Sequence, residues 1–161
     1  HASAGNDTLT GVASGTVSTF LTFLNPGAGT NVVNGNGTTL NVLDLRSLPG
    51  PSTTDLAASI STGPTSTNTL NAVRSVALSN GGDSAAGSDA GLEYFFSGAG
   101  NDTINGRGGV DYASWYFFDV AVRLDLTLAS GQAVQGTAVD TVLEIERFVT
   151  SNRDDTIIGT A

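Results

Sequence analysis

The chain contains no cysteine, no methionine and no lysine, and its one histidine is His1. Without cysteine there can be no disulfide, thiolate nucleophile or sulfur ligand for a metal. One histidine cannot build an imidazole metal cluster, and its place at position 1 removes His-dependent catalytic triads. No apolar run approaches the roughly 20 residues that span a bilayer, and no signal peptide opens the chain. These absences exclude most hydrolase mechanisms and predict no membrane insertion.

The charge of the chain is strongly one-sided. Asp and Glu number 15 against 6 arginines in 161 residues, a formal net charge of -9. The arginines are scattered, at positions 46, 74, 107, 123, 147 and 153. They cannot form an electropositive face, so we expect no nucleic-acid partner. The excess acids should lie in solvent or hold a hard cation through oxygen, which makes calcium the candidate ligand.

The composition predicts an all-β fold with many short strands. The chain has 21 glycines, and 39% of its residues are hydrophobic. Glycine and asparagine interrupt every helical pattern, whereas runs such as residues 120–128 (VAVRLDLTL) alternate with the period of a strand. Phenylalanine and aliphatic residues recur throughout, which argues against a disordered linker.

Internal repeats organise the chain. The frame S-x-x-x-D-(T/S)-x-x-G occurs at residues 3–11, 79–87 and 151–159, and residues 27–37 (GAGTNVVNGNG) match 98–108 (GAGNDTINGRG). Further matches join residues 56–63 to 124–131 and 69–80 to 141–152. We therefore predict one solenoid-like domain over residues 1–161. It would contain two imperfect tandem units, about 3–78 and 79–150, and a partial third repeat at 151–161.

A nine-residue period appears within the second unit. Asp102 and Asp111 are nine residues apart and each follows glycines. This segment resembles the nonapeptide GGxGxDxUx of the RTX, or hemolysin-type, calcium-binding family. The resemblance implies a right-handed parallel β-roll or β-solenoid with about 18 residues in each turn. Glycines would permit tight turns, the aspartate would supply an anionic oxygen, and the apolar U position would enter the core.

The first predicted calcium site pairs two turns. Asp83 and Asp102 are separated by about one turn and both follow glycines, so a calcium ion between them would contact both loops. The metal-ligand candidates at this edge are Gly81, Asp83, Gly98, Gly100 and Asp102.

A second site is predicted at the opposite edge. Asp111 would lie there with the carbonyls of Gly106, Gly108 and Gly109, and its partner loop is not evident from the sequence. Half-sites are expected where the repeat frame recurs, to be completed by another turn, copy or chain. Their candidate ligands are Asp7, Asp154 and Asp155. In the first unit Asn31 stands where the second has Asp102, so that turn is predicted to be structural only.

Other candidate features have simpler interpretations. Glu144 and Glu146 are expected on the solvated face of a strand. The aromatic residues at 94–96, 112 and 115–118 could stack sugar rings or bind a protein, but core packing is the favoured interpretation. The threonines do not recur at a fixed interval, which disfavours an ice-binding face. A carbohydrate ligand has no specific support in the sequence.

The resemblance implies a secreted bacterial protein that leaves a Gram-negative cell by type I secretion and folds when external calcium binds. We expect a non-catalytic structural or adhesive module of a surface layer, extracellular filament or large adhesin. Both ends of the sequence fall within a repeat, so we expect association with neighbouring repeats or with further copies, end to end. The alternative is a calcium-binding accessory module of a secreted protease, lipase or polysaccharide-modifying enzyme.

Overall fold

The structure, a computed structural model, describes residues 4–12, 21–37, 39, 41–89 and 91–159. These residues form 17 strands and contain no helix, and so none long and apolar enough to cross a membrane. The all-β prediction is confirmed. The first eight strands are β1 (Thr8–Thr10), β2 (Thr22–Leu24), β3 (Gly29–Asn34), β4 (Asn41–Asp44), β5 (Thr53–Asp55), β6 (Ile60–Thr62), β7 (Ser66–Asn71) and β8 (Ser75–Ala77). The others are β9 (Ser84–Ala86), β10 (Tyr94–Phe96), β11 (Thr103–Asn105), β12 (Tyr112–Ser114), β13 (Val122–Asp125), β14 (Ala133–Gln135), β15 (Ala138–Leu143), β16 (Arg147–Val149) and β17 (Thr156–Ile158).

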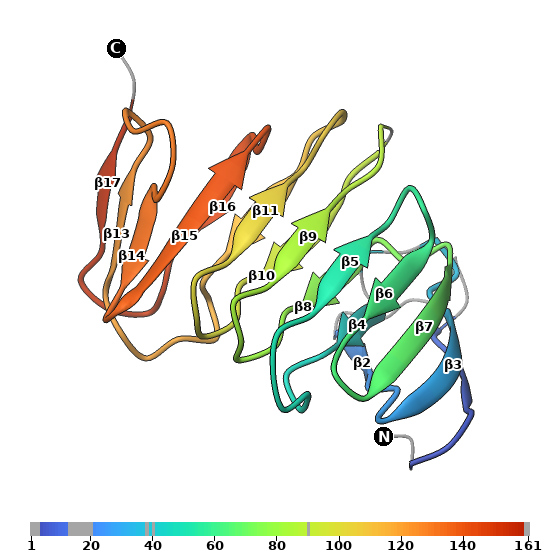
Figure 1. The fold of residues 1–161 in the computed structure, drawn as a ribbon. Coiled ribbons are helices and arrows are strands. Elements are labelled where there is room, and N and C mark those ends of the chain that lie inside the picture. The colour runs from blue at the N-terminus through green and yellow to red at the C-terminus, as the bar shows by residue number, and fades with distance from the viewer. Residues whose placement is uncertain (1–3, 13–20, 38, 40, 90, 160–161) are drawn as a thin grey trace.

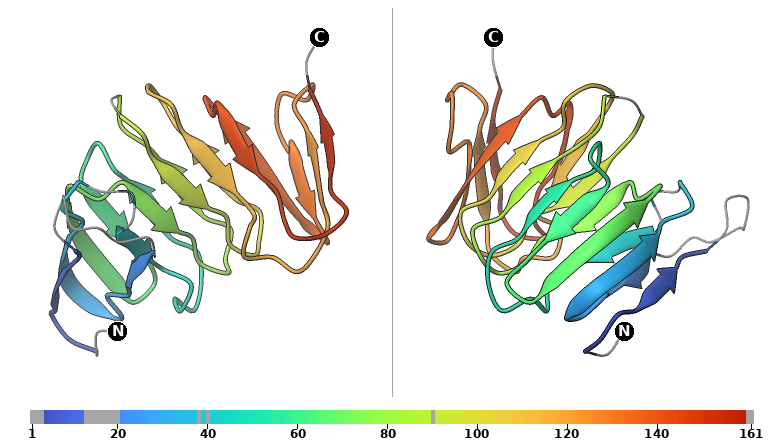
Figure 2. Two further views of the ribbon diagram at one scale, coloured as in Figure 1. Left: turned by 180° about the vertical axis from the view of Figure 1, so that it is seen from behind. Right: turned by 45° about the vertical axis from the view of Figure 1, so that its right-hand side comes forward.

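The strands form two sheets whose pairings are mostly parallel. The larger sheet has eleven strands in the order β1-β3-β7-β6-β5-β9-β11-β15-β14-β13-β17, and the smaller has six, β16-β12-β10-β8-β4-β2. From β7 to β13 the chain alternates between the two sheets, which is the course of a solenoid. The N- and C-termini lie at opposite ends of the stack (Figure 1), and this remains so in two further views (Figure 2).

Two antiparallel meanders interrupt the parallel stacking. β5, β6 and β7 form the first meander, and β13, β14 and β15 form the second. Each meander adds three strands to the large sheet. Over the same stretch of chain the small sheet advances by one strand, from β4 to β8 or from β12 to β16. Neighbouring strands lie about 4.8 Å apart, so the large sheet is longer along the stack.

The order of the strands repeats after eight. The segment β1-β3-β7-β6-β5-β9 of the large sheet recurs as β9-β11-β15-β14-β13-β17. The register recurs as well, because Thr53 of β5 pairs with Ser84 of β9 as Arg123 of β13 pairs with Thr156 of β17. Each position in β1–β8 therefore has a structural equivalent in β9–β16.

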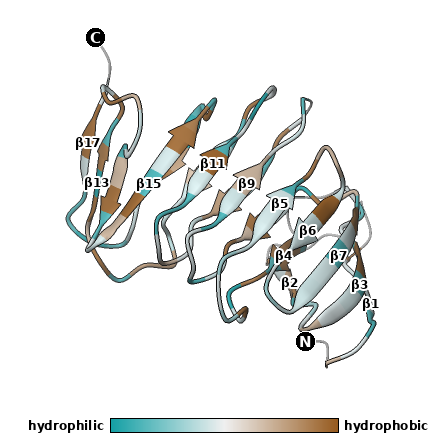
Figure 3. Ribbon diagram, viewed as in Figure 1, coloured by the Kyte–Doolittle hydropathy of each residue, from teal (hydrophilic) through white to brown (hydrophobic). Residues whose placement is uncertain are grey.

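The core lies between the sheets and is built from stacked rows of apolar side chains. Val76, Phe95 and Ala113 are in register on three neighbouring strands of the small sheet, and all are fully buried. Polar and apolar residues share most strands (Figure 3), as expected for sheets with one buried face.

The aromatic residues divide between the core and the surface. Phe95 and Trp115 are buried in the core, as predicted. Tyr94 stacks on Tyr112, however, with ring centroids 4.1 Å apart, and both lie on the outer face of the small sheet. Three more rings contact one another on that face: Phe23, Phe96 and Phe117. Phe96 is nevertheless buried in a small cluster with Val42 and Ala77, so core packing is confirmed for Phe95, Phe96 and Trp115. It was the wrong prediction for Tyr116 and Phe117, which are exposed.

Glycines allow the turns to stack closely. A Cβ on Gly98 would lie 1.5 Å from the carbonyl oxygen of Ser79, which belongs to the preceding turn. Gly100 has a positive φ of 100°, and a Cβ there would lie 2.5 Å from the carbonyl oxygen of Gly81. The turns can approach this closely only because these positions carry no side chain.

We expect Gly98→Ala to destabilise the fold by more than about 3 kcal/mol, because its methyl group would meet backbone that cannot move aside. Gly159→Ala is the matched control, since a Cβ there meets nothing within 4 Å. Its effect should stay within about 0.5 kcal/mol. Urea unfolding followed by circular dichroism measures both. Equal losses of stability in the two variants would contradict close stacking at Gly98.

Candidate functional site

Three buried aspartates form a row along one edge of the solenoid, two directly before β9 and β11 and one within β15. Asp83, Asp102 and Asp140 are 3%, 1% and 0% exposed. The N–H of Asp83 donates to Asp102 Oδ1 and that of Asp102 to Asp140 Oδ1, each over 2.9 Å. Each carboxylate thus satisfies a backbone donor of the neighbouring turn. We call these three residues the Asp83 row.

Every carboxylate oxygen of the Asp83 row has a hydrogen-bond partner. The Ser79 hydroxyl lies 2.8 and 3.0 Å from the two Asp83 oxygens, and the Trp115 indole N–H donates to Asp140 Oδ2 over 2.7 Å. The Ser97 hydroxyl lies 2.9 Å from both Asp102 Oδ2 and Asp140 Oδ2. A hydroxyl carries one proton, so both contacts are full hydrogen bonds only when one of the two carboxyl groups is protonated.

The electrostatics of the Asp83 row favour the same protonation. Burial raises the pKa of Asp102 to about 7, and the charges of Asp140 and Asp83 act in the same direction. Burial likewise raises the pKa of Asp140 above its ordinary value. The row therefore gains stability when a proton or a cation reduces its negative charge.

A second acidic row lies at the opposite edge, in the turns that lead into β10, β12 and β16. Its members are Glu93, Asp111 and Glu146, and we call them the Asp111 row. The Glu93 N–H donates to Asp111 Oδ1 over 3.0 Å, and the Asp111 N–H donates to Glu146 Oε2 over 2.8 Å. Burial, followed by the charges of Glu93 and Glu146, raises the pKa of Asp111 to about 6.

Asp111 differs from the aspartates of the Asp83 row in one respect. It is fully buried, and its Oδ2 has no hydrogen-bond partner among the described residues. A Cβ on Gly106 would lie 2.7 Å from this oxygen and 2.2 Å from the carbonyl oxygen of Glu144. A Cβ on Gly87 would lie 2.3 Å from the Gly106 carbonyl oxygen and 2.4 Å from Glu93 Oε2. Oxygen atoms of three successive turns therefore gather beside two glycines.

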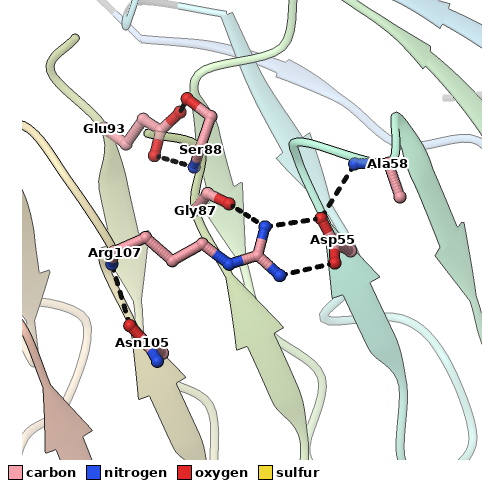
Figure 4. A network of polar contacts seen from close by, with 7 residues as sticks. All are labelled: Asp55, Ala58, Gly87, Ser88, Glu93, Asn105 and Arg107. Carbon is pink, nitrogen blue, oxygen red and sulfur yellow. Dashed lines mark hydrogen bonds and ion pairs between the residues drawn. The ribbon is translucent and has the colours of Figure 1, made fainter. Parts of the chain in front are cut away.

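A polar network holds the loops of this edge in place (Figure 4). Arg107 reaches across β9 to form a bidentate ion pair with Asp55, at 2.8 and 3.1 Å, and also donates to the carbonyl of Gly87. The backbone N–H and the hydroxyl of Ser88 donate to Glu93 over 2.9 and 2.5 Å. Gly108 belongs to the same stack, since a Cβ there would lie 3.1 Å from the Asp89 carbonyl oxygen. These contacts fix the orientation of the Glu93 carboxylate and of the Gly87 carbonyl.

The predicted ligands lie at the two edges to which the sequence assigned them. Gly81, Gly98 and Gly100 are in the turns that carry Asp83 and Asp102. Sequence reasoning missed Asp140, which stands one residue before the repeat match at 141–152, and Glu93, which no motif marked. Glu144 and Glu146 are not on a strand as predicted, because β15 ends at Leu143 and β16 begins at Arg147. They lie in the intervening turn, where Glu146 joins the Asp111 row.

The half-site residues occupy different environments. Asp155 is the equivalent of Asp83: it accepts the Val122 N–H over 2.7 Å and the Ser151 hydroxyl over 2.8 Å. The Asp7 N–H donates to Asn31 Oδ1 over 3.0 Å, and Asp7 Oδ2 is buried without a partner among the described residues. Asp154 is exposed.

The first unit carries amides where the second carries acids. Its Asn31, Asn68 and Asn41 are the structural equivalents of Asp102, Asp140 and Asp111. Asn31 Nδ2 donates to Asn68 Oδ1 over 2.9 Å, so an uncharged contact closes that row. The Val12 N–H donates to Asn41 Oδ1 over 2.9 Å, much as the Glu93 N–H donates to Asp111. Three carboxylates of the second unit are thus uncharged amides in the first, which keeps one acid of the Asp83 row in Asp7.

The donor sets of the two acidic rows suit a cation differently. Among the described residues, no three acidic or histidine side chains gather closely enough to hold a metal ion by themselves. A cation would therefore need backbone carbonyls as well, as calcium often has. In the Asp83 row the carboxylate oxygens already accept hydrogen bonds, whereas Asp111 Oδ2 does not. The residues around Asp111 fit a hard cation better.

No protein-family model, curated protein or solved structure matches the chain.

In the presence of a chelator, we expect the free energy of unfolding to fall as the pH rises from 5 to 8. Unfolded Asp102 loses its proton near its ordinary pKa of 3.8, whereas folded Asp102 keeps it up to about pH 7. The folded state thus binds the extra proton, and its advantage disappears as the pH rises. For Asp102 the loss between pH 5 and pH 8 is at most about 3 kcal/mol, because only the interval from pH 5 to about 7 contributes.

Urea unfolding at several pH values measures this dependence. Asp102→Asn should make the profile less steep, because the amide does not titrate, and burial of Asp111 and Asp140 accounts for the slope that remains. A wild-type stability that rises between pH 5 and pH 8 would contradict the expected sign.

Proposed function

We propose that this chain is a secreted, calcium-binding structural or adhesive repeat module that folds on binding calcium. The observation that carries the proposal is the buried, unpartnered Asp111 Oδ2, which lies in a row with Glu93 and Glu146 and next to Gly106. We also propose that the solenoid is a right-handed β-roll, with calcium in the turns of its second unit.

Asp111 and Glu93 would hold the ion, together with backbone carbonyls such as that of Gly106. Bound calcium supplies positive charge and several coordination positions for oxygen. Without it, three carboxylates on successive turns repel one another in a region shielded from water, which opposes close stacking. The contacts of Arg107 and Ser88 fix the positions of the turns around Gly87 and Glu93, but they do not neutralise the charge of Asp111. Because the site exists only in the folded state, the free energy of calcium binding at the Asp111 row adds to the free energy of folding.

The Asp83 row would respond to calcium more weakly. Its oxygens accept backbone and hydroxyl donors, so a cation there would compete with hydrogen bonds that are already formed. The first unit would respond less, since Asn31, Asn68 and Asn41 stand where the second unit has Asp102, Asp140 and Asp111. Calcium-coupled folding is therefore proposed for β9–β16.

A structural role is supported by the free edges of the sheets. β17 lies at the edge of the large sheet and repeats the position of β9. Ile157 of β17 is 57% exposed, whereas its equivalent Ala85 of β9 is 2% exposed because β5 and β11 flank it. An edge with an exposed core-type residue favours pairing with a further strand. We propose that another copy or a neighbouring repeat occupies it.

We expect calcium to raise the stability of the wild-type protein over its value in chelator, by about 2.7 kcal/mol at 100 times the dissociation constant. Thermal unfolding by circular dichroism in EGTA, calcium and magnesium measures the difference. Asp111→Asn should lose most of the calcium-dependent gain, because the amide is a weaker and uncharged ligand.

The matched control is Asp89→Asn, which removes an exposed acid from the same loop as Glu93. It should keep the response of the wild type. Equal stability of the wild type in chelator and in calcium would overturn the proposal. Sedimentation of the same samples tests association, which should increase with protein concentration when calcium is present.

Hydrogen exchange should locate the response within the chain. Backbone amides in β9–β16 should gain protection when calcium replaces chelator, while those in β1–β8 should change little, because Asn41 stands there in place of Asp111. Mass spectrometry of peptic fragments measures both units in one sample. Equal gains in the two units would contradict a calcium site confined to the second.

A further inference from the structure

A row of hydroxyl side chains crosses the outer face of the large sheet. Strand pairing aligns seven residues on seven neighbouring strands without a gap. In their order across the sheet they are Thr30, Thr67, Thr62, Thr53, Ser84, Thr103 and Thr141. Their spacing is that of the strands, about 4.8 Å. We call this set the hydroxyl row.

The irregular spacing of threonine in the sequence conceals this regularity. The meander of β5, β6 and β7 runs back along the sheet, so Thr67, Thr62 and Thr53 follow one another in reverse chain order. The parallel strands β9 and β11 then continue the row. Irregular spacing of threonine in the sequence therefore does not exclude a regular row of hydroxyls in space.

The middle of the row lines a groove of about 440 Å³. Thr62, Thr53, Ser84 and Thr103 contribute to it from four adjacent strands. All four are exposed, and none of their hydroxyls bonds to another described residue. Pro51, Gly63, Gly82 and Asn101 complete the wall at the sheet edge. The groove thus offers free donors and acceptors at regular intervals over about 14 Å.

The groove is electrically neutral although the chain is strongly acidic. Asp83 is its one charged lining residue, and that carboxylate accepts bonds from Ser52 and Ser79 rather than facing solvent. On the same sheet face Asp55 is neutralised by Arg107. An anionic ligand would find no cation in this groove, and a cationic one no free carboxylate. A neutral ligand rich in hydroxyl groups suits the lining best.

We infer that this groove binds a neutral polysaccharide chain laid across β6, β5, β9 and β11. A linear glycan presents hydroxyl groups at regular intervals, and these could exchange hydrogen bonds with successive members of the row. The groove volume lies within the usual range for ligand sites. An ice lattice fits less well, since the adjacent outward row carries Thr69, Ile60, Asp55 and Ala86 and the surface is hollowed.

Affinity electrophoresis tests the inference. The full chain in calcium is run through gels that contain hydroxyethylcellulose, dextran, galactomannan or no polysaccharide. At least one neutral polysaccharide should retard the wild type. The double variant Thr53→Val, Thr62→Val removes two groove hydroxyls but keeps side-chain shape and strand propensity. It should bind at least tenfold more weakly.

The matched control is Thr69→Val, Thr156→Val, which changes two exposed threonines of the same sheet outside the groove. It should be retarded like the wild type. Circular dichroism establishes that each variant is folded. Absence of retardation by all three polysaccharides would overturn the inference, as would equal loss of binding in both double variants. Inhibition of ice recrystallisation without retardation would point to a lattice ligand instead.

The inference does not depend on calcium binding. Repeating the gels in EGTA separates the two proposals, because a chain that stays folded in chelator and is still retarded would support the groove while contradicting calcium-coupled folding.

Discussion

The structure depends on one repeated contact, in which a side-chain oxygen at the start of one turn accepts a backbone N–H from the neighbouring turn. Asp102 and Asp140 make this contact at one edge, and Asp111 and Glu146 make it at the other. It satisfies a backbone donor that has no partner within a strand. Because the accepting side chains are buried, the same contact that aligns the turns also determines how much charge the solenoid encloses.

The two units resolve this constraint with different residues. Asparagine supplies the oxygen in the first unit without charge, as at Asn31 and Asn41. Aspartate supplies it in the second, where burial raises the pKa of Asp102 and Asp111. A buried carboxylate favours whatever neutralises it, either a proton or a cation. One backbone design thus yields a unit with fewer buried carboxylates and a unit that should respond more strongly to its ionic surroundings.

The outward side chains of the two sheets are not needed to hold the turns together, because contacts at the edges and in the core do so. On the small sheet the outward positions carry stacked aromatic rings, including Tyr94 and Tyr112. On the large sheet they carry the hydroxyl row and its neutral groove. The first meander contributes to the hydroxyl row, since β5 and β6 bring Thr53 and Thr62 into line with Ser84 of the regular turns.

The sequence by itself determined the all-β class, because glycine and asparagine recur too often for helices and the apolar residues alternate. It also marked Asp83, Asp102 and Asp111 through their glycine-rich frames. It did not reveal Glu93, Asp140 or Glu146, because these lie up to 38 residues from their neighbours in the two rows and follow no shared motif. Only the tertiary structure decided which oxygens are satisfied and which hydroxyls align, since an antiparallel meander reverses the order of strands in space relative to the chain.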